Sequence, residues 1–279
     1  MVLFVTKADG TKQLFDREKV IRTCLRMGAT REIAEKIVEK IEMKIYAGIE
    51  TRKILNMIFR QLRNYRAAIK HQIDLRKALS LMKPKPDFER FVQILLREHG
   101  YRVSPNQIIT GKCTEHEVDA VATKDGETYI VEVKHHFKYH TPTGLDVSRI
   151  ARAVFEDVTE GFKLGLNSLR INNAMIVCNT KLSEHAKRYA KCRGIYHIGW
   201  SSPSNRNLQT MIEEKKLYPI TYLKGLNITT RRKLASVRII LLKQLTAKNL
   251  EELRRETGIR REALTSIIEK ARITLSENE

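Results

Sequence analysis

The sequence predicts a multidomain α/β protein, in which a β-hairpin and a helical bundle precede a central α/β core with a mixed sheet, and an all-α segment ends the chain. The 279 residues are enough for two or three domains. Strand patterns recur in the middle of the chain, whereas the C-terminal part has helical patterns alone. Two prolines within residues 83–86 interrupt a helical pattern. We therefore expect domains at residues 1–83, 84–211 and 212–279.

The first domain is expected to begin with a hairpin over residues 5–15, because Asp9-Gly10 is a common two-residue turn. Asp16 follows at a position that caps a helix over residues 17–27, since a carboxylate accepts the free N–H groups of a first turn. Further helices are predicted at residues 29–46, 50–62 and 63–82.

The central domain is expected to begin with an amphipathic helix over residues 87–99 that is capped by Asp87. Glu89 stands in its first turn, where the helix dipole alone favours an acidic residue. A catalytic role for Glu89 is the alternative, and both interpretations stay open. The inward-facing positions of the helix are Phe88, Phe91, Val92, Leu95 and Leu96.

A second hairpin is predicted at residues 125–126, where Asp-Gly separates two β-rich runs. Counting outward from this turn brings Asp119 directly opposite Glu132. Strand alternation then puts Lys134 on the same face as Glu132, while Val133 points the other way. Two carboxylates at cross-strand distance repel each other, so the pair requires a cation.

These residues fit metal-assisted hydrolysis of a phosphodiester. A hard cation such as Mg²⁺ takes oxygen ligands, acidifies a bound water and neutralises charge on a phosphate. Lys134 is suited to orient that water or to stabilise the developing charge. Glu-x-Lys alone is common on exposed strands, and it is Asp119 that favours a functional site. His116, His135, His136 and His140 lack zinc-site spacing and are expected to line a polar groove or contact phosphate.

Residues 87–209 resemble the PD-(D/E)xK nuclease superfamily, and within it the Mrr-like and archaeal Holliday-junction-resolvase-like branch. The motifs that carry the resemblance are Phe88-Glu89-Arg90, His116-Glu117-Val118-Asp119, Glu132-Val133-Lys134 and Ala174-Met175-Ile176-Val177. The resemblance implies a restriction-endonuclease-like core that holds Mg²⁺ or Mn²⁺, with Asp119, Glu132 and Val133 as the metal-binding residues. It also implies that Lys134 is the catalytic lysine and that Glu89 is an acidic residue on the first helix of the core. Glu132 stands where many Mrr-like proteins have Gln, which is closer to the resolvase-like pattern.

Residues 2–82 resemble the ATP-cone domain of ribonucleotide reductases and their transcriptional regulator, through Val5, Lys7, Asp9-Gly10, Phe15-Asp16 and Lys19-Val20. The resemblance implies that ATP or dATP binds there as a regulatory ligand. Lys7, Lys12 and Lys19 would contact its phosphates, and Val5 and Phe15 would lie near its base. The usual Arg after the first Lys is Ala8 here. The alternative is a small helical bundle whose lysines are merely solvated.

The C-terminal domain is expected to contain helices over residues 230–237, 248–255 and 262–271, with glycine turns before the first and the last. This pattern resembles a pair of helix-hairpin-helix motifs, which bind DNA phosphate through backbone amides at the glycine turn. A helical bundle for oligomerisation is the alternative. The candidate DNA-binding residues, which gather at the turns, are Lys224, Arg231, Arg232, Lys233, Arg260 and Arg261.

The composition favours nucleic acid as the partner, since 52 Lys and Arg against 32 Asp and Glu give a net charge of +20. We expect no membrane segment, because no stretch is long and apolar enough. Four cysteines without paired spacing indicate a reducing, cytoplasmic compartment, with Cys24 and Cys178 as buried thiols. Double-strand cutting usually needs two active sites, which favours a homodimer.

Three interpretations follow from the sequence. The first is a Mg²⁺-dependent DNA endonuclease regulated by an adenine nucleotide. The second is a non-catalytic, nucleotide-sensing DNA-binding protein, against which the intact set of Asp119, Glu132 and Lys134 argues. The third is a structure-specific Holliday-junction resolvase, which differs from the first only in its substrate. We expect the first.

Overall fold

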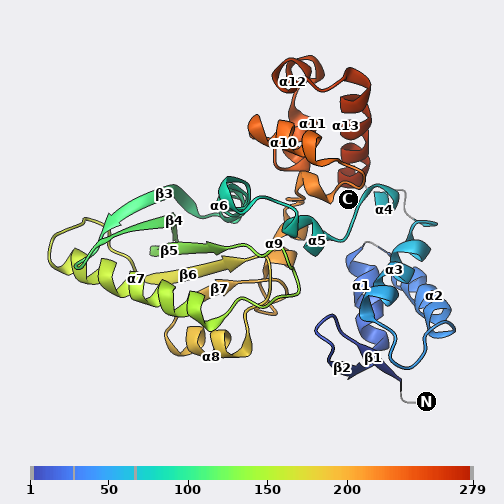
Figure 1. Ribbon diagram of the computed structural model, residues 1–279, viewed down its shortest axis with the longest axis horizontal. Helices are drawn as coiled ribbons and strands as arrows, with labels where there is room; N and C mark the ends of the chain where they lie inside the picture. The colour runs from blue at the N-terminus through green and yellow to red at the C-terminus, as the bar shows by residue number, and fades with distance from the viewer. Residues whose placement is uncertain (1–2, 28, 66–67, 277–279) are drawn as a thin grey trace. The chain divides into compact units, whose positions relative to one another are not determined.

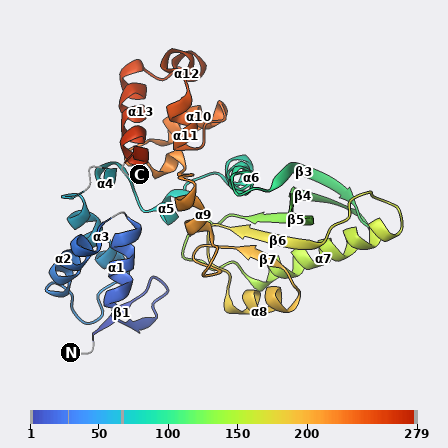
Figure 2. The ribbon, with the colours of Figure 1, turned by 180° about the vertical axis from the view of Figure 1, so that it is seen from behind.

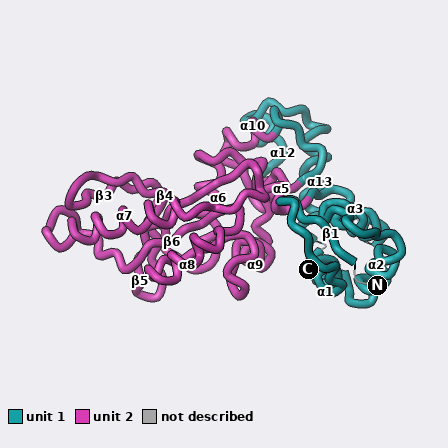
Figure 3. Tube along the Cα trace, turned by 60° about the horizontal axis from the view of Figure 1, so that its bottom comes forward, with its two compact units in different colours: residues 1–73, 223–230, 246–279 teal, residues 74–222, 231–245 magenta. Residues whose placement is uncertain are grey.

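The computed structural model describes residues 3–27, 29–65 and 68–276 and divides the chain into two compact units (Figures 1 and 3). The two units do not follow the order of the chain, because segments of the C-terminal part belong to both. The three-domain division therefore stays a prediction. The first unit comprises residues 1–73, 223–230 and 246–279, and the second comprises residues 74–222 and 231–245.

The first unit begins with the predicted hairpin, in which β1 (Phe4–Thr6) pairs antiparallel with β2 (Lys12–Leu14). Asp16 caps α1 (Arg17–Arg26) as expected, because its carboxylate accepts the backbone N–H of Lys19. A core of aliphatic side chains such as Val5, Ile21, Ile37 and Leu62 holds the hairpin to the helices. The other helices of this unit are α2 (Arg31–Glu42), α3 (Thr51–Leu62), α4 (Ala68–His71), α12 (Leu250–Thr257) and α13 (Arg261–Ser276).

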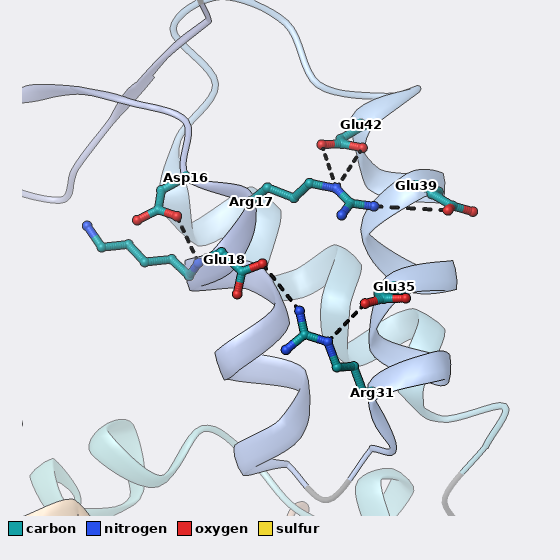
Figure 4. A network of polar contacts seen from close by, with 8 residues as sticks. Asp16, Arg17, Glu18, Arg31, Glu35, Glu39 and Glu42 are labelled. Carbon is teal, nitrogen blue, oxygen red and sulfur yellow. Dashed lines mark hydrogen bonds and ion pairs between the residues drawn. The ribbon is translucent and has the colours of Figure 1, made fainter.

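A surface network of ion pairs joins α1 to α2 (Figure 4). Arg17 contacts Glu42 at 3.3 Å, and Arg31 contacts Glu35 at 3.0 Å and Glu18 at 3.6 Å. All of these side chains are exposed, so each pair contributes only about 0–1 kcal/mol. The buried aliphatic core, rather than this network, therefore dominates the stability of the unit.

The helix predicted over residues 63–82 is wrong as a continuous element. α3 ends at Leu62, α4 covers Ala68–His71 and α5 covers Leu75–Ser80, with residues 66–67 outside the described part of the chain. Asp74 starts a new helix at this point, because its carboxylate accepts the backbone N–H of Lys77 at 2.8 Å.

The second unit contains a five-stranded sheet with the order β3-β4-β5-β6-β7. The first three strands are antiparallel and the last three are parallel, which confirms the predicted mixed sheet. α6 lies on one side of the sheet, and α7 and α8 lie on the other (Figures 1 and 2). The elements are α6 (Glu89–Glu98), β3 (Arg102–Thr110), β4 (Glu115–Lys124), β5 (Glu127–Lys134), α7 (Leu145–Lys163), β6 (Asn173–Cys178), α8 (Glu184–Cys192) and β7 (Tyr196–Ile198).

The hairpin of β4 and β5 forms as predicted, with Lys124 paired to Glu127 around the turn. Asp125 and Gly126 have φ angles of 51° and 80°, so both adopt the left-handed conformation that a two-residue hairpin turn requires. The regular pairing extends to Ala120 and Val131, one residue short of the predicted pair of carboxylates.

The edge strand β3 was not predicted from the sequence. It pairs with β4 but contains Pro105, and Asn106 has a φ of 47°. Proline and a left-handed residue are both atypical of a strand interior, and they are tolerated here because β3 is at the edge of the sheet.

The predicted cap of the first core helix is also wrong. A turn over Pro84–Phe88 with an extended backbone at Lys85 precedes α6, and the backbone N–H of Glu89 donates to the carbonyls of Pro84 and Pro86. Neither this turn nor α6 has a side-chain cap among the described residues. Asp87 has no capping role, because carbonyls of the preceding turn satisfy the N–H group that it would have accepted.

Helix α7 approaches the turn between β3 and β4 so closely that only glycine fits at position 161. A Cβ atom on Gly161 would lie 2.8 Å from the carbonyl oxygen of Thr110 and 2.8 Å from the carbonyl carbon of Gly111. We expect Gly161→Ala to lower the free energy of unfolding by about 1–3 kcal/mol, because backbone atoms must move apart. Urea denaturation measures this change, with Lys163→Ala at an exposed position of α7 as the control. Equal midpoints for the two variants would contradict the expectation.

The remaining elements show why the C-terminal part is shared between the units. Within the second unit, the backbone N–H of Ile220 donates to Ile240 and that of Leu242 donates to Tyr218. These four residues are buried, and α11, which the sequence did not predict, begins at Leu242. None of the described helices is long and apolar enough to cross a membrane. The elements are α9 (Leu208–Glu214), a 3-10 turn (Ile220–Tyr222), α10 (Ile228–Ser236) and α11 (Leu242–Ala247).

Candidate active site

A pocket of about 320 Å³ lies where β5 ends beside the start of α6. It gathers all five residues that the sequence analysis proposed for catalysis or metal binding in the central domain. Their roles stay predictions, whereas their proximity is a feature of the fold. The pocket is lined by Pro84, Lys85, Glu89, Glu117, Asp119, Glu132, Val133, Lys134 and His135.

Asp119 is fixed by main-chain contacts from two directions. Its Oδ2 accepts the backbone N–H of Val133 at 2.7 Å, which ties the carboxylate to β5. Its main-chain carbonyl accepts a hydrogen bond from the Gln93 side chain of α6 at 3.1 Å. Glu89 lies one turn before Gln93 on the same helix, so α6 brings a second buried carboxyl group to Asp119.

Burial and the neighbouring Asp119 carboxylate raise the pKa of Glu132 to about 7. The ammonium groups of Lys134 and Lys85 oppose this rise. The same two causes, burial first and then the charge of Asp119, raise the pKa of Glu89. The pocket therefore holds more negative charge than its own lysines balance, which is the condition that the sequence analysis inferred from the carboxylate pair.

The raised pKa of Glu132 gives a testable pH dependence of stability without metal. A carboxyl group that binds its proton more tightly in the folded state stabilises that state below pH 4.5, and this contribution is lost as pH rises through 7. Glu132→Gln has no carboxyl group to titrate at this position, so its stability should not fall over this pH range. We expect its free energy of unfolding at pH 8 to exceed that of the wild type by about 2 kcal/mol. Urea denaturation in EDTA at pH 5 and pH 8 measures this difference. Glu127→Gln, at an exposed position of β5, should behave like the wild type at both pH values.

Lys85 is a pocket residue that the sequence analysis missed. Its ammonium lies 3.2 Å from Glu89 Oε1, 3.5 Å from Asp119 Oδ1 and 3.6 Å from Glu117 Oε1. The hydrogen bond with Glu89, together with the charges of Asp119 and Glu117, raises the pKa of Lys85 to about 12. The sequence offered no local signal for this contact, because Lys85 has an extended backbone with φ −117° and ψ 136° and is not a helical neighbour of Glu89.

The donor chemistry of the pocket fits a hard divalent cation, since carboxylate oxygens are the ligands that Mg²⁺ and Mn²⁺ prefer. An ammonium already lies among these carboxylates as a cation of lower charge. In the described ranges, no three Asp, Glu, His or Cys side chains converge as a metal site would require. The residues fit the ion by charge and by donor type but are not gathered around one point, and the Lys85 ammonium lies among the oxygens that would bind the ion.

The four histidines have separate environments, and the ring of His140 lies against that of Tyr139, with centroids 4.2 Å apart. His135 lines the pocket, and its Nε2 lies 3.0 Å from the carbonyl oxygen of Leu79. His136 contacts Thr143, and His116 contacts Asp157 at 2.8 Å, where its hydrogen bond is the main cause that lowers the pKa of Asp157 to about 2. Of the four, His135 alone is among the residues that line the pocket, and His116 anchors the start of β4 to α7.

The predicted nucleotide-binding residues lie on the hairpin and the start of α1. Lys7, Lys12 and Lys19 are exposed, and none of them forms an ion pair within the described residues. Phe15 is half-buried against the core, whereas Val5 is 2% exposed and belongs to the core itself. Contact of these five residues with a nucleotide stays a prediction.

The predicted DNA-binding residues lie at two glycine turns. Gly258, with a φ of 60°, ends α12 and precedes α13, which gives the second predicted helix–turn–helix unit. Gly225 follows a 3-10 turn instead of an α-helix, so the first unit differs from the pattern. Of the six basic residues, Lys224, Arg232, Arg260 and Arg261 are exposed, and Arg231 and Lys233 are half-buried.

Family models match three consecutive segments of the chain. They are an ATP cone domain at residues 3–81, a restriction endonuclease domain at residues 81–198 and the C-terminal domain of AF1548-like proteins at residues 218–273. An uncharacterized protein of Archaeoglobus fulgidus is 35% identical over 179 residues, covering 64% of this chain and 96% of that protein. A second one from the same organism is 49% identical over 41 residues, covering 15% of this chain and 87% of that protein. The crystal structure titled "Protein of Unknown Function AF1548" is 34% identical with a TM-score of 0.57, covering 67% of this chain and 96% of that one.

The fold and these matches define a class of protein in which a restriction endonuclease-like domain is joined to an ATP cone domain. The chain belongs to the AF1548-like family, because it matches a 35% identical relative over 96% of that relative. The resemblances of the first two segments are thereby confirmed. The likeness of residues 212–279 to helix-hairpin-helix motifs stays a prediction.

Proposed function

We propose that this protein is a divalent-metal-dependent DNA endonuclease whose activity is regulated by ATP or dATP bound to its ATP cone domain. The observation that carries the proposal is that Glu89, Asp119, Glu132 and Lys134 line one pocket of a restriction endonuclease-like domain. A net charge of +20 supports a polyanionic substrate.

Asp119, Glu132 and the main-chain carbonyl of Val133 would hold the ion, and Glu89 would add a carboxylate from α6. When bound, the ion supplies an acidified water and neutralises charge on the phosphate. Lys134 stabilises the negative charge that develops on the phosphate as the water oxygen bonds to phosphorus and the bond to the leaving sugar oxygen breaks. Because Val133 donates its N–H to Asp119, the metal-binding end of β5 is held to β4 before any ligand arrives.

Regulation by a nucleotide is supported by the ATP cone match and by three exposed lysines on the hairpin and α1, none of which has an ion pair in the described part of the chain. Phosphate groups bind where amines meet a helix N-terminus, and Lys19 lies in the first turn of α1. Calorimetric titration of the full chain with ATP and with dATP tests this part. Absence of heat with both nucleotides would show that the first domain binds neither ATP nor dATP and would contradict this part of the proposal.

The nuclease itself is tested with supercoiled plasmid and with a synthetic four-way junction, each in Mg²⁺, Mn²⁺ or EDTA and with or without ATP. Metal-dependent nicking or linearisation of plasmid supports the proposal. Strong preference for the junction would instead indicate a Holliday-junction resolvase. A DNA gel shift without cleavage of either substrate would indicate a non-catalytic, nucleotide-sensing DNA-binding protein. Sedimentation on a short duplex tests the proposed homodimer.

A further inference from the structure

Lys85 occupies an unusual position for a lysine of a surface turn. Its stem leaves the turn before α6, and its ammonium reaches into the pocket between Glu89 and Asp119. Both of those side chains are buried, at 9% and 10% exposed, whereas the Lys85 side chain is 63% exposed. An ammonium on an exposed stem therefore pairs with two buried carboxylates.

The buried carboxylates depend on this ammonium in the ligand-free protein. Like charges at short distance in a poorly solvated pocket repel strongly, and removal of their counter-ion leaves buried charge without compensation. Lys134 lines the same pocket, but within the described residues none of its carboxylate neighbours lies within ion-pair distance. Lys85 is thus the lysine that directly pairs with Glu89 and Asp119.

We propose that the Lys85 ammonium is the resident counter-ion of the metal site and that a divalent ion binds by displacing it from Glu89 and Asp119. The inference rests on the proposed function, since it assigns the regulation of metal access at the same site. Metal binding is then an exchange of one cation for another at oxygens that are already ordered.

Exchange follows from the few oxygen atoms available. Asp119 Oδ2 accepts the backbone N–H of Val133, so Oδ1 is the less engaged oxygen of this carboxylate, and the Lys85 ammonium lies 3.5 Å from it. An ammonium and a divalent ion at that oxygen would repel each other. The exit path is short, because Glu117 already pairs with Lys85 at 3.6 Å and is 70% exposed. The ammonium can leave the two buried groups while it keeps this partner at the mouth of the pocket.

The inference predicts that charge at position 85 weakens metal binding. Lys85→Met keeps the length of the stem and removes the competitor, so we expect the dissociation constant for Mn²⁺ to fall roughly fivefold, as expected for loss of partly exposed ion pairs. Lys85→Arg keeps the charge and should bind Mn²⁺ like the wild type. Lys83→Met removes an equal charge two residues away, from an exposed side chain without an ion pair to these carboxylates among the described residues, and should leave the affinity unchanged.

The experiment is calorimetric titration of Mn²⁺ into the full-length wild type and the three variants, without DNA or nucleotide, at one ionic strength. Tighter binding by Lys85→Met alone supports displacement. Equal or weaker binding by Lys85→Met, with clear binding by the wild type, overturns the displacement and leaves the proposed nuclease intact. An equal gain in Lys83→Met would also overturn it, because the effect would then be one of net charge. Lack of saturable binding in all four proteins would remove the metal site itself, and with it both proposals.

Discussion

Replacing Lys134 with alanine is expected to lower the rate of DNA cleavage by about 10²–10³-fold, which is the usual cost of removing one charge-stabilising group from a transition state. Lys134 lines the pocket with Asp119 and Glu132, and its ammonium is one of the charges that act on Glu132. The side chain is exposed at the end of β5, so its loss leaves no cavity in the core. The fold should therefore survive.

The binding of DNA separates this effect from a loss of affinity. One lysine among 52 basic residues contributes little to the total attraction for phosphates, so we expect the affinity of Lys134→Ala for duplex to change by less than about twofold at fixed salt. The matched control is Lys138→Ala, an exposed lysine four residues further along the chain and outside the pocket. Cleavage should be measured under single-turnover conditions with saturating metal. Cleavage by Lys134→Ala at the rate of Lys138→Ala would contradict the assigned role.

The central hairpin shows which features of the site can be predicted from local sequence patterns. A two-residue turn at Asp125 and Gly126 determines the register of β4 and β5, and the register brings Asp119 to the end of β5 where Glu132 and Lys134 lie. The inference needs only the period of a strand and the chemistry of a turn, both of which are readable in sequence. It does not give the detail that Asp119 bonds to the backbone N–H of Val133, because this contact replaces the last ladder pair.

The features that sequence did not give depend on contacts between distant segments. Two prolines flank Lys85 and indicated a domain boundary, and the turn with an extended backbone at Lys85, which brings its ammonium to Glu89, was not predicted. The ion pairs with Glu117 and Asp119 become visible only once β4 is packed beside that turn. The same holds for the strand β3 and for the residues around Leu242, whose partners lie far away in the chain.

The domain boundaries have a practical consequence for experiments. Residues 212–222 and 231–245 belong to the second unit, and Ile220 and Leu242 are buried in it. Removal of residues 212–279 would therefore expose the core of the unit that carries the pocket, and a change in DNA binding would not be attributable to the helical turns. Charge substitutions at exposed Arg260 and Arg261 are a cleaner test of the predicted DNA contacts, because they leave the core intact.

Replacing Asp119 with asparagine is expected to weaken Mn²⁺ binding by about 100-fold or more and to abolish cleavage, because a neutral amide is a poor ligand for a hard cation. The substitution keeps the shape of the side chain, and its amide oxygen can still accept the N–H of Val133. The hairpin should therefore form normally. Because the charge of Asp119 helps to raise the pKa values of Glu132 and Glu89, its removal should lower both of these values.

The loss of Mn²⁺ binding and of cleavage distinguishes a metal ligand from a merely structural residue. If Asp119 served only to hold the hairpin, Asp119→Asn would bind Mn²⁺ and cleave DNA like the wild type. Glu115→Gln is the matched control, since Glu115 is an exposed carboxylate of β4 outside the pocket and should alter Mn²⁺ affinity by no more than about threefold. Calorimetry with Mn²⁺ gives the affinities, and thermal unfolding in EDTA verifies that both variants are folded. Removal of the Asp119 charge relieves repulsion among the buried carboxylates, so Asp119→Asn should unfold at a higher temperature than the wild type above pH 7. The carboxylate that binds the metal thus destabilises the metal-free fold.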